Sequence, residues 1–166
     1  MINSPRGAQL PLPPDDFVAI QRLVHRYSDA VVHRDAEQWS SCWADDAEWD
    51  LGRGRKVEGL TAIVDLWVRA MGGFAAVVQM VHNGDAWLTS DEHHATGRWF
   101  IDERFQRADG ETGMLLAHYE DRYVRRDGQW LFASRFLEVH YRGAADMSGE
   151  FLNTAAALEA RRSADA

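Results

Sequence analysis

A single carboxylate interrupts an apolar strand face in the stretch ATGRWFIDERF, residues 95–105. The stretch alternates with the two-residue period of a β-strand, which places Glu103 on the same face as Trp99, Ile101 and Phe105. An ionised carboxylate is costly to bury among apolar side chains, and such burial raises its pKa. Glu103 therefore fits either a frayed strand end or an apolar cavity in which a carboxyl group exchanges protons with a ligand.

Two further predicted strands carry faces of the same kind, apolar with polar groups near the middle. The odd-numbered residues of 112–125 and 129–142 form these faces and include Tyr119, Asp121 and Arg135. Arg135 could bind negative charge that develops on a substrate. It could equally form a structural ion pair with Asp121 across adjacent strands.

A histidine stands in the strand predicted over 76–90. Val78, Met80 and His82 share one face of this strand, but a bulge near the HNGD motif could change which face points inward. An imidazole that meets a carboxyl group can take a proton from carbon and return one to a leaving hydroxyl. His82 could instead be a buried histidine that is hydrogen-bonded to the backbone. The other histidines show no compact spacing typical of metal ligands, so no metal site is predicted.

The elements that must position these residues follow an α+β order, with helices first and a sheet afterwards. Apolar residues recur at helical spacing in the first segment, and Asp-Gly pairs at 109–110 and 127–128 indicate hairpins between strands. We expect a cone-shaped α+β barrel in which N-terminal helices pack on a strongly curved antiparallel or mixed sheet and enclose a pocket. The predicted helices cover 15–35, 36–46 and 60–73, and the predicted strands cover 47–52, 76–90, 94–107, 112–125 and 129–142.

Length and composition favour one compact domain with a small-molecule partner. The 166 residues are divided into a flexible arm (1–14), a domain (15–143) and a tail (144–166). A net charge of -8 argues against nucleic acid and an anionic membrane surface as partners, and no apolar run has membrane-spanning length. The single cysteine, Cys42, excludes an internal disulfide and fits the cytoplasm. The many aromatic residues suit a pocket for a flat, bulky ligand.

Five segments, taken in order, resemble the SnoaL-like branch of the nuclear transport factor 2-like superfamily. They are IQRLVHRYSDAVVHRDAEQW, WADDAEWD, the histidine in QMVHNG, ATGRWFIDE and YEDRYVRRDGQWLF. The resemblance covers residues 15 to about 142. It implies an enzyme that eliminates water or HCl from a substrate in a cone-shaped pocket, without metal or organic cofactor.

The resemblance also implies roles for single residues. His82 matches a general base, Tyr27 a tyrosine of the first helix, and Arg135 an arginine that helps the leaving group. Glu103 falls where relatives carry a pocket aspartate or a second histidine. The substrate-binding residues expected from the resemblance and from strand parity are Trp43, Met80, Trp99, Ile101, Tyr119, Asp121, Leu137 and Val139.

One position departs from the pattern of the resemblance. Relatives carry an aspartate that orients the histidine five residues after the Tyr27 position, and this chain has Val32 there. The usual aspartate–histidine pair is therefore missing. Glu103 could take the place of the aspartate if it meets His82 from across the sheet.

Three classes of function follow from these observations. The first is a cofactor-independent lyase that expels water or a small group from a bulky hydroxylated aromatic or alicyclic substrate, with a retro-aldol variant. The second is an isomerase or polyketide cyclase, and the third is a non-catalytic binding or adaptor protein. The even-numbered strand faces, with His118, Phe132, Phe136 and His140, are apolar enough to predict packing on the third helix and on another subunit. The resemblance suggests a homotrimer, or else a dimer.

Overall fold

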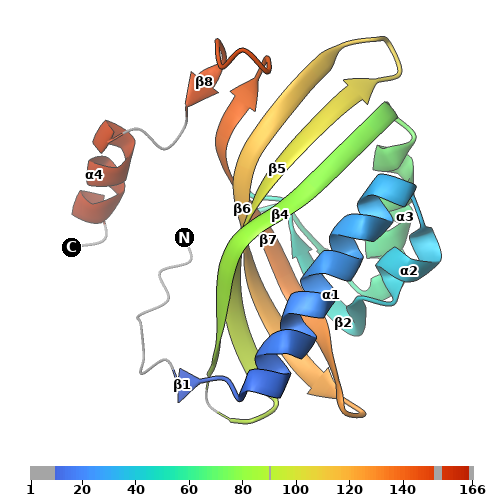
Figure 1. Ribbon diagram of the computed structural model, residues 1–166, viewed down its shortest axis with the longest axis vertical. Helices are drawn as coiled ribbons and strands as arrows, with labels where there is room; N and C mark the ends of the chain where they lie inside the picture. Colours follow the sequence, from blue (N-terminus) through green and yellow to red (C-terminus); the bar gives the residue numbers. More distant parts are fainter. Residues whose placement is uncertain (1–9, 90, 152–154, 165–166) are drawn as a thin grey trace.

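The computed structural model describes residues 10–89, 91–151 and 155–164 of the chain. Helices precede a curled, unclosed sheet (Figure 1). The helices are α1 (Pro14–His33), α2 (Ala36–Ser40), α3 (Leu60–Met71) and α4 (Ala155–Ala164). The strands are β1 (Leu10–Pro11), β2 (Trp43–Asp50), β3 (Lys56–Glu58), β4 (Phe74–Leu88), β5 (His94–Arg107), β6 (Thr112–Arg126), β7 (Gln129–Gly143) and β8 (Glu150–Phe151).

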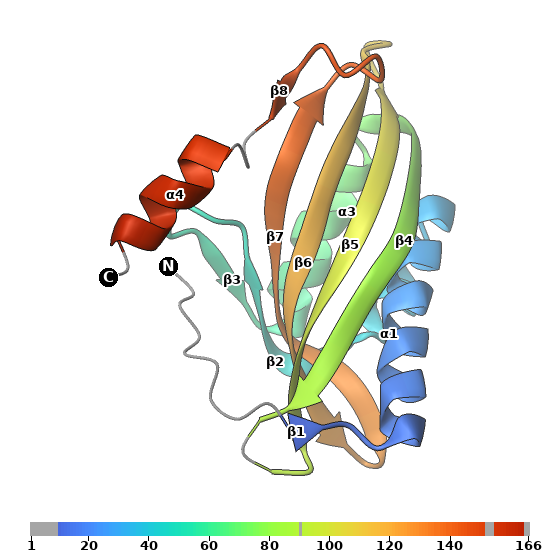
Figure 2. The same cartoon turned by 60° about the vertical axis from the view of Figure 1, so that its left-hand side comes forward.

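The strands form one mixed sheet in the order β1-β4-β5-β6-β7-β2-β3, and β8 pairs with β7. The β2–β7 pair is parallel and the other pairs are antiparallel. Helices α1 and α3 lie on one side of the curled sheet, and α4 lies on the other side (Figures 1 and 2). The predicted α+β class, with N-terminal helices on a strongly curved sheet, is confirmed.

Helix α1 is the longest helix, and it packs on the concave face of the sheet. Its buried residues recur at the predicted helical spacing, and they pack into the same core as Ile63 and Trp67 of α3. The prediction that the third helix covers the even-numbered strand faces is therefore wrong, because α3 packs on the concave side. The buried apolar residues of α1 are Ile20, Leu23, Val24, Tyr27, Ala30 and Val31.

The hairpin between β6 and β7 forms as its Asp-Gly pair predicts. Asp127 and Gly128 both have positive φ, 50° and 77°, and they separate the paired residues Arg126 and Gln129. Two central residues with positive φ are the requirement of a type I′ turn, which glycine and aspartate tolerate. This turn sets the register in which β7 starts against β6.

Tertiary pairing overrides local helical spacing in the second predicted helix. That helix was expected over 36–46, but it ends at Ser40 and β2 begins at Trp43. Trp43 pairs with Phe132 of β7, and the Phe132 amide donates to the Cys42 carbonyl at 2.9 Å. Sheet hydrogen bonds therefore replace the last helical turns of the predicted segment.

A register shift in β7 corrects the predicted position of Phe132. The pairing passes from Arg122–Ser134 to Tyr123–Phe132, which leaves Ala133 without an opposite residue. Such a bulge reverses side-chain parity along a strand. Phe132 is consequently fully buried in the core, although strand parity placed it on the even-numbered outer face.

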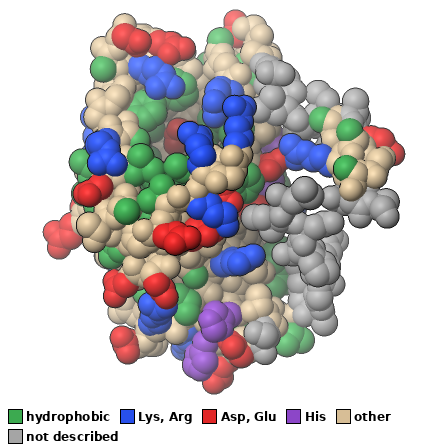
Figure 3. All heavy atoms as spheres, turned by 180° about the vertical axis from the view of Figure 1, so that it is seen from behind, with side chains coloured by type: hydrophobic (Ala, Val, Ile, Leu, Met, Phe, Trp, Pro, Cys, Tyr) green, Lys and Arg blue, Asp and Glu red, His purple; other side chains and the backbone are tan. Residues whose placement is uncertain are grey.

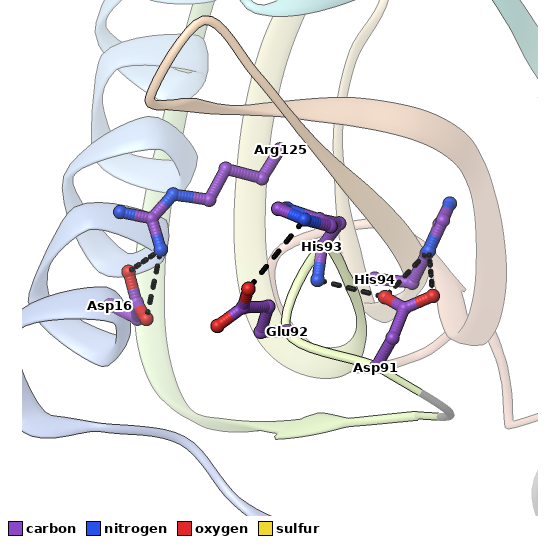
Figure 4. A network of polar contacts seen from close by, with 6 residues as sticks. All are labelled: Asp16, Asp91, Glu92, His93, His94 and Arg125. Atoms are coloured by element: carbon purple, nitrogen blue, oxygen red, sulfur yellow. Dashed lines mark hydrogen bonds and ion pairs between the residues drawn. The ribbon is translucent and has the colours of Figure 1, made fainter.

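Polar contacts join the narrow end of the molecule (Figure 4). Asp16, in the first turn of α1, accepts a hydrogen bond from Trp130 Nε1 at 3.0 Å and forms an ion pair with Arg125 at 3.2 Å. These contacts fix the start of α1 to β6 and β7. None of the helices in the described part of the chain is long and apolar enough to span a membrane.

Candidate functional site

The wide end of the concave face carries a polar group built around Glu103. Gln79 of β4 and Glu103 of β5 are directly opposite each other, and Gln79 Nε2 donates to Glu103 Oε2 at 2.8 Å. The same Nε2 lies 3.2 Å from the hydroxyl of Tyr119 on β6. Helix α1 anchors the other side, because Ser28 Oγ donates to the Gln79 backbone carbonyl at 2.8 Å. Burial raises the pKa of Glu103, and the hydrogen bond from Gln79 offsets this only in part.

A second polar network lies deeper in the cone. Arg135 of β7 donates twice to Asp121 of β6, from Nε and from Nη2, both at 2.8 Å. Tyr123 also donates to Asp121, at 2.8 Å, and Trp99 Nε1 donates to the Tyr123 hydroxyl at 2.9 Å. Arg135 is therefore part of a buried ion pair with Asp121, one of the two roles that the sequence left open for it.

Aromatic rings enclose the Arg135 guanidinium. Its central carbon lies 3.7 Å from the ring centroid of Tyr119, 4.0 Å from that of Phe132 and 4.1 Å from that of Tyr27. Burial alone would lower the pKa of Arg135, but the Asp121 carboxylate outweighs burial and holds this pKa above its ordinary value. The site therefore contains a permanent positive charge beneath Tyr119 and Tyr27.

Tyr27 of α1 lies between the two networks. It is 2% exposed, and its ring packs against Tyr119 at 5.8 Å and Trp39 at 5.4 Å between centroids. Burial raises the pKa of Tyr27, while Arg135 acts in the opposite direction. Both tyrosines therefore stay protonated at neutral pH and can donate hydrogen bonds.

The structure corrects the prediction that His82 and Glu103 meet in one cavity. His82 and Asn83 occupy a bulge between the pairs Val81–Ile101 and Gly84–Trp99. His82 is exposed there, whereas Glu103 is on the inner face with Gln79. An imidazole in this bulge cannot reach the Glu103 carboxyl across the strand.

No other histidine takes the expected place. All seven histidines are within the described residues, and none of them is hydrogen-bonded to Glu103 there. The ring of His25, on α1, packs edge-on against the ring of Trp99 at 6.5 Å between centroids. His25, His33, His93 and His94 are exposed. His118 Nδ1 lies 2.6 Å from His140 Nε2, on the outer face where both rings pack near Phe100. The Glu103 carboxyl group is therefore hydrogen-bonded to Gln79 and not to a histidine.

The remaining predicted residues divide between the two faces of the sheet. Met80 is 49% exposed and shares the outer face with Val78, so the expectation that it contacts a ligand inside the cone is corrected. The same bulge explains this, because Val77, Gln79 and Val81 are the inward residues that precede it. The predicted residues that lie in the interior are Trp43, Trp99, Ile101, Tyr119 and Asp121, which are buried, and Leu137 and Val139, which are half-buried.

Sequence reasoning missed Gln79. The signal was present, because Gln79 alternates with Val77 and Val81 as the one polar residue on that face. Its Oε1 atom is buried and has no hydrogen-bond partner in the described part of the chain, as is also true of Arg135 Nη1. Buried polar atoms without partners are rare and indicate places where a ligand or a rearrangement could satisfy them.

The concave face is less completely buried at the Glu103 end than around Arg135. Aromatic side chains fill the deeper part around Arg135, whereas Glu103, Leu137 and Val139 are only half-buried. The best-defined depressions of the described surface are elsewhere. One of about 520 Å³ lies beside the start of α3, and one of about 210 Å³ lies on the outer side of the β4 bulge.

This chain has helices on the concave face of a curled sheet and a polar group between them, which is the arrangement of a cone-shaped α+β fold. Residues 15–136 match the family model of the SnoaL-like domain, and the chain belongs to this family. No curated protein matches the sequence.

Solved structures show the same fold at low sequence identity. A proposed scytalone dehydratase from Novosphingobium aromaticivorans is 20% identical, with a TM-score of 0.72 over 83% of this chain and 93% of that chain. A hexachlorocyclohexane dehydrochlorinase, LinA-type3 from Novosphingobium barchaimii, is 22% identical, with a TM-score of 0.66 over 75% and 86%. A protein of unknown function from Mycobacterium tuberculosis is 23% identical, with a TM-score of 0.65 over 89% and 86%. At these identities the likeness concerns the fold.

Proposed function

We propose that this protein is a lyase that uses its own side chains, with the Glu103 carboxyl as general acid and base. The substrate class is a bulky hydroxylated aromatic or alicyclic molecule, which suits the aromatic interior. The names of the dehydratase and dehydrochlorinase neighbours support a lyase as the reaction type. Glu103 takes the role that the resemblance implies for His82, because His82 is exposed in the β4 bulge.

The observation that carries this proposal is the environment of Glu103. Its carboxyl group is held by Gln79 Nε2 on the inner face of the sheet, and burial raises its pKa. A carboxyl group whose pKa approaches the working pH can both accept and return a proton. Among the residues that the structure describes, no cation pairs with the Glu103 carboxyl, which leaves its proton available for exchange with a substrate.

Two reactions fit one carboxyl group. In an elimination, the carboxylate takes the proton from carbon and returns it to the hydroxyl group, which leaves as water. In a retro-aldol cleavage, it takes the proton from the substrate hydroxyl, and the broken carbon–carbon bond leaves an aldehyde and a carbanion that is then reprotonated. The hydroxyls of Tyr27 and Tyr119 are the proposed donors to the oxygen that develops negative charge in either transition state. The Arg135–Asp121 pair supports both rings from beneath.

The test is turnover of a panel of such alcohols, with product masses measured. Loss of 18 mass units indicates dehydration, and release of a small aldehyde indicates retro-aldol cleavage. We expect Glu103→Gln to lower kcat/KM by at least about a hundredfold, since a positioned acid–base group contributes 10²–10⁴-fold. Glu120→Gln, on the outer face, is the matched control and should keep the full rate. Full activity of Glu103→Gln would overturn the proposal, and a product of unchanged mass would select an isomerase or cyclase.

A non-catalytic binding protein is the second candidate. Two observations favour this candidate. Val32 stands at the position of the expected aspartate, and His82, the expected general base, is exposed. Tight binding of panel compounds without any turnover would select this candidate over the lyase.

We also propose a cytoplasmic homo-oligomer that acts on a small molecule. The outer sheet face bears Val78 and Met80 on β4, 43% and 49% exposed, and the half-buried Phe100 on β5 and Phe136 on β7. On the face shown in Figure 3, basic, acidic and hydrophobic side chains are mixed, and no continuous basic surface extends across it. Together with the net charge of -8, this mixture argues against nucleic acid as the partner.

A further inference from the structure

Gln79 is placed by three contacts on three different elements. Its side chain reaches Glu103 on β5 and Tyr119 on β6, and its backbone carbonyl accepts from Ser28 on α1. It is 6% exposed, so water contributes little to its surroundings. The amide is therefore held beside the Glu103 carboxyl rather than free to move away from it.

A side-chain amide suits both forms of a carboxyl group. Its nitrogen donates to a carboxylate, which only accepts, and its oxygen accepts from a carboxylic acid, which carries one donor. Rotation about the last side-chain bond exchanges the two atoms, and this torsion is broad and two-fold. In the structure Nε2 faces Glu103, and Oε1 has no partner among the described residues.

We propose that Gln79 is a positioning residue that holds Glu103 in both protonation states, with Nε2 on the carboxylate and Oε1 on the carboxylic acid. The inference rests on the proposed role of Glu103 and deepens it. An acid–base residue changes its hydrogen-bonding character twice in each cycle. A partner that can follow this change keeps the carboxyl group in one place throughout.

Few charged groups compete with Gln79 for this role. Tyr119 on β6 and Tyr27 on α1 face the site as neutral hydroxyls, and Arg135 on β7 has its charge paired with Asp121. Gln79 supplies the hydrogen bond that Glu103 accepts. The proton affinity of Glu103 is therefore set by burial, which favours the acid, and by Gln79, which favours the carboxylate.

The experiment replaces Gln79 with a near-isosteric side chain that cannot hydrogen-bond. In Gln79→Met, titration of the Glu103 side-chain carboxyl by carbon-13 NMR should give a higher pKa than in the unchanged protein, because the donor to the carboxylate is lost. Gln106→Met, at an exposed position of β5, the strand of Glu103, is the matched control and should leave this pKa unchanged. The acid limb of the kcat/KM profile should move to higher pH in Gln79→Met by the same amount.

The outcomes separate this inference from the proposed function. An unchanged pKa of Glu103 in Gln79→Met overturns the inference, even if the enzyme turns over substrate. A raised pKa supports it, even if no panel compound reacts. If Gln79→Met does not fold, Gln79→Glu provides the second measurement. Two carboxyls in contact should titrate in two separated steps, and two unperturbed titrations would overturn the inference.

Discussion

Glu103 and Glu120 belong to the same sheet, but their surroundings shift their pKa values in opposite directions. Glu103 is on the concave face, where burial raises its pKa. Glu120 is on the outer face, where it accepts from Arg98 Nε at 2.6 Å and from His118 Nε2 at 3.0 Å. Burial acts against the charged form of Glu120 as well, but these two partners hold its pKa below its ordinary value. The presence of a paired cation, rather than burial alone, separates the lowered pKa of Glu120 from the raised pKa of Glu103.

The two residues should affect stability with opposite dependence on pH. Above the ordinary glutamate value of 4.5, an unfolded chain loses its Glu103 proton more readily than the folded chain, so rising pH favours unfolding. Glu103→Gln removes this effect, and the variant should gain stability relative to the unchanged protein between pH 4.5 and neutral pH. The stability that Glu120 contributes is present above pH 4.5 and is lost as pH falls through its lowered pKa, so Glu120→Gln should be most harmful near neutral pH.

Urea denaturation of the unchanged protein and both variants, from pH 4 to pH 8, measures these differences. The sign of the pH dependence is the decisive quantity. Parallel curves for Glu103→Gln and Glu120→Gln would contradict the assignment of the two environments.

Among the elements, β4 shows where sequence reasoning succeeds and where it stops. Its strand character, its length and its hairpin to β5 follow from local patterns. Its inward face does not, because His82 and Asn83 enter a bulge whose position depends on packing against β5. The resemblance places His82, with Met80 on the same face, on the inner side, whereas in the structure both are exposed and Gln79 is the inward residue. The inward faces of β5 and β6, which have no bulge between them, were predictable, and Glu103 and Tyr119 lie as expected.

Gly84 fixes the end of this bulge. It is the register partner of Trp99, whose ring lies over the glycine. A Cβ atom at this position would be 2.3 Å from Trp99 Cε3 and 2.7 Å from the Arg98 carbonyl oxygen. The Trp99 ring is 1% exposed and hydrogen-bonded to Tyr123, so it has little freedom to move aside.

Gly84→Ala should therefore destabilise the fold by about 1–3 kcal/mol, the usual range for overpacking a core. Asn83→Ala, at the exposed neighbouring position, should change the free energy of unfolding by less than about 0.5 kcal/mol. Chemical denaturation measures both values. Equal effects of the two substitutions would show that contact with Trp99 does not determine the bulge.

On the scale of the whole molecule, α4 is the helix of the described residues that lies on the outer side of the sheet, opposite α1 and α3. Figure 2 shows this face, with α1 and α3 beyond the sheet and α4 to one side. Arg161 of α4 forms an ion pair with Glu138 at the margin of the face. The apolar residues Val78 and Met80, on β4, lie far from that contact along the strand order of the sheet. In the proposed homo-oligomer, a second copy of the chain packs against Val78 and Met80.

A lysine on this face should break the oligomer without harming the fold. Met80→Lys places a charge that would lose its water at an apolar contact, so we expect the mass measured by light scattering at micromolar concentration to fall from a multiple of the chain mass to that of one chain. Val68→Lys is the matched control, because Val68 is equally exposed at 49% but belongs to α3 on the other side of the sheet. It should leave the mass unchanged. A single-chain mass for the unchanged protein would refute the oligomer, and loss of assembly in Val68→Lys alone would move the interface to the helical side.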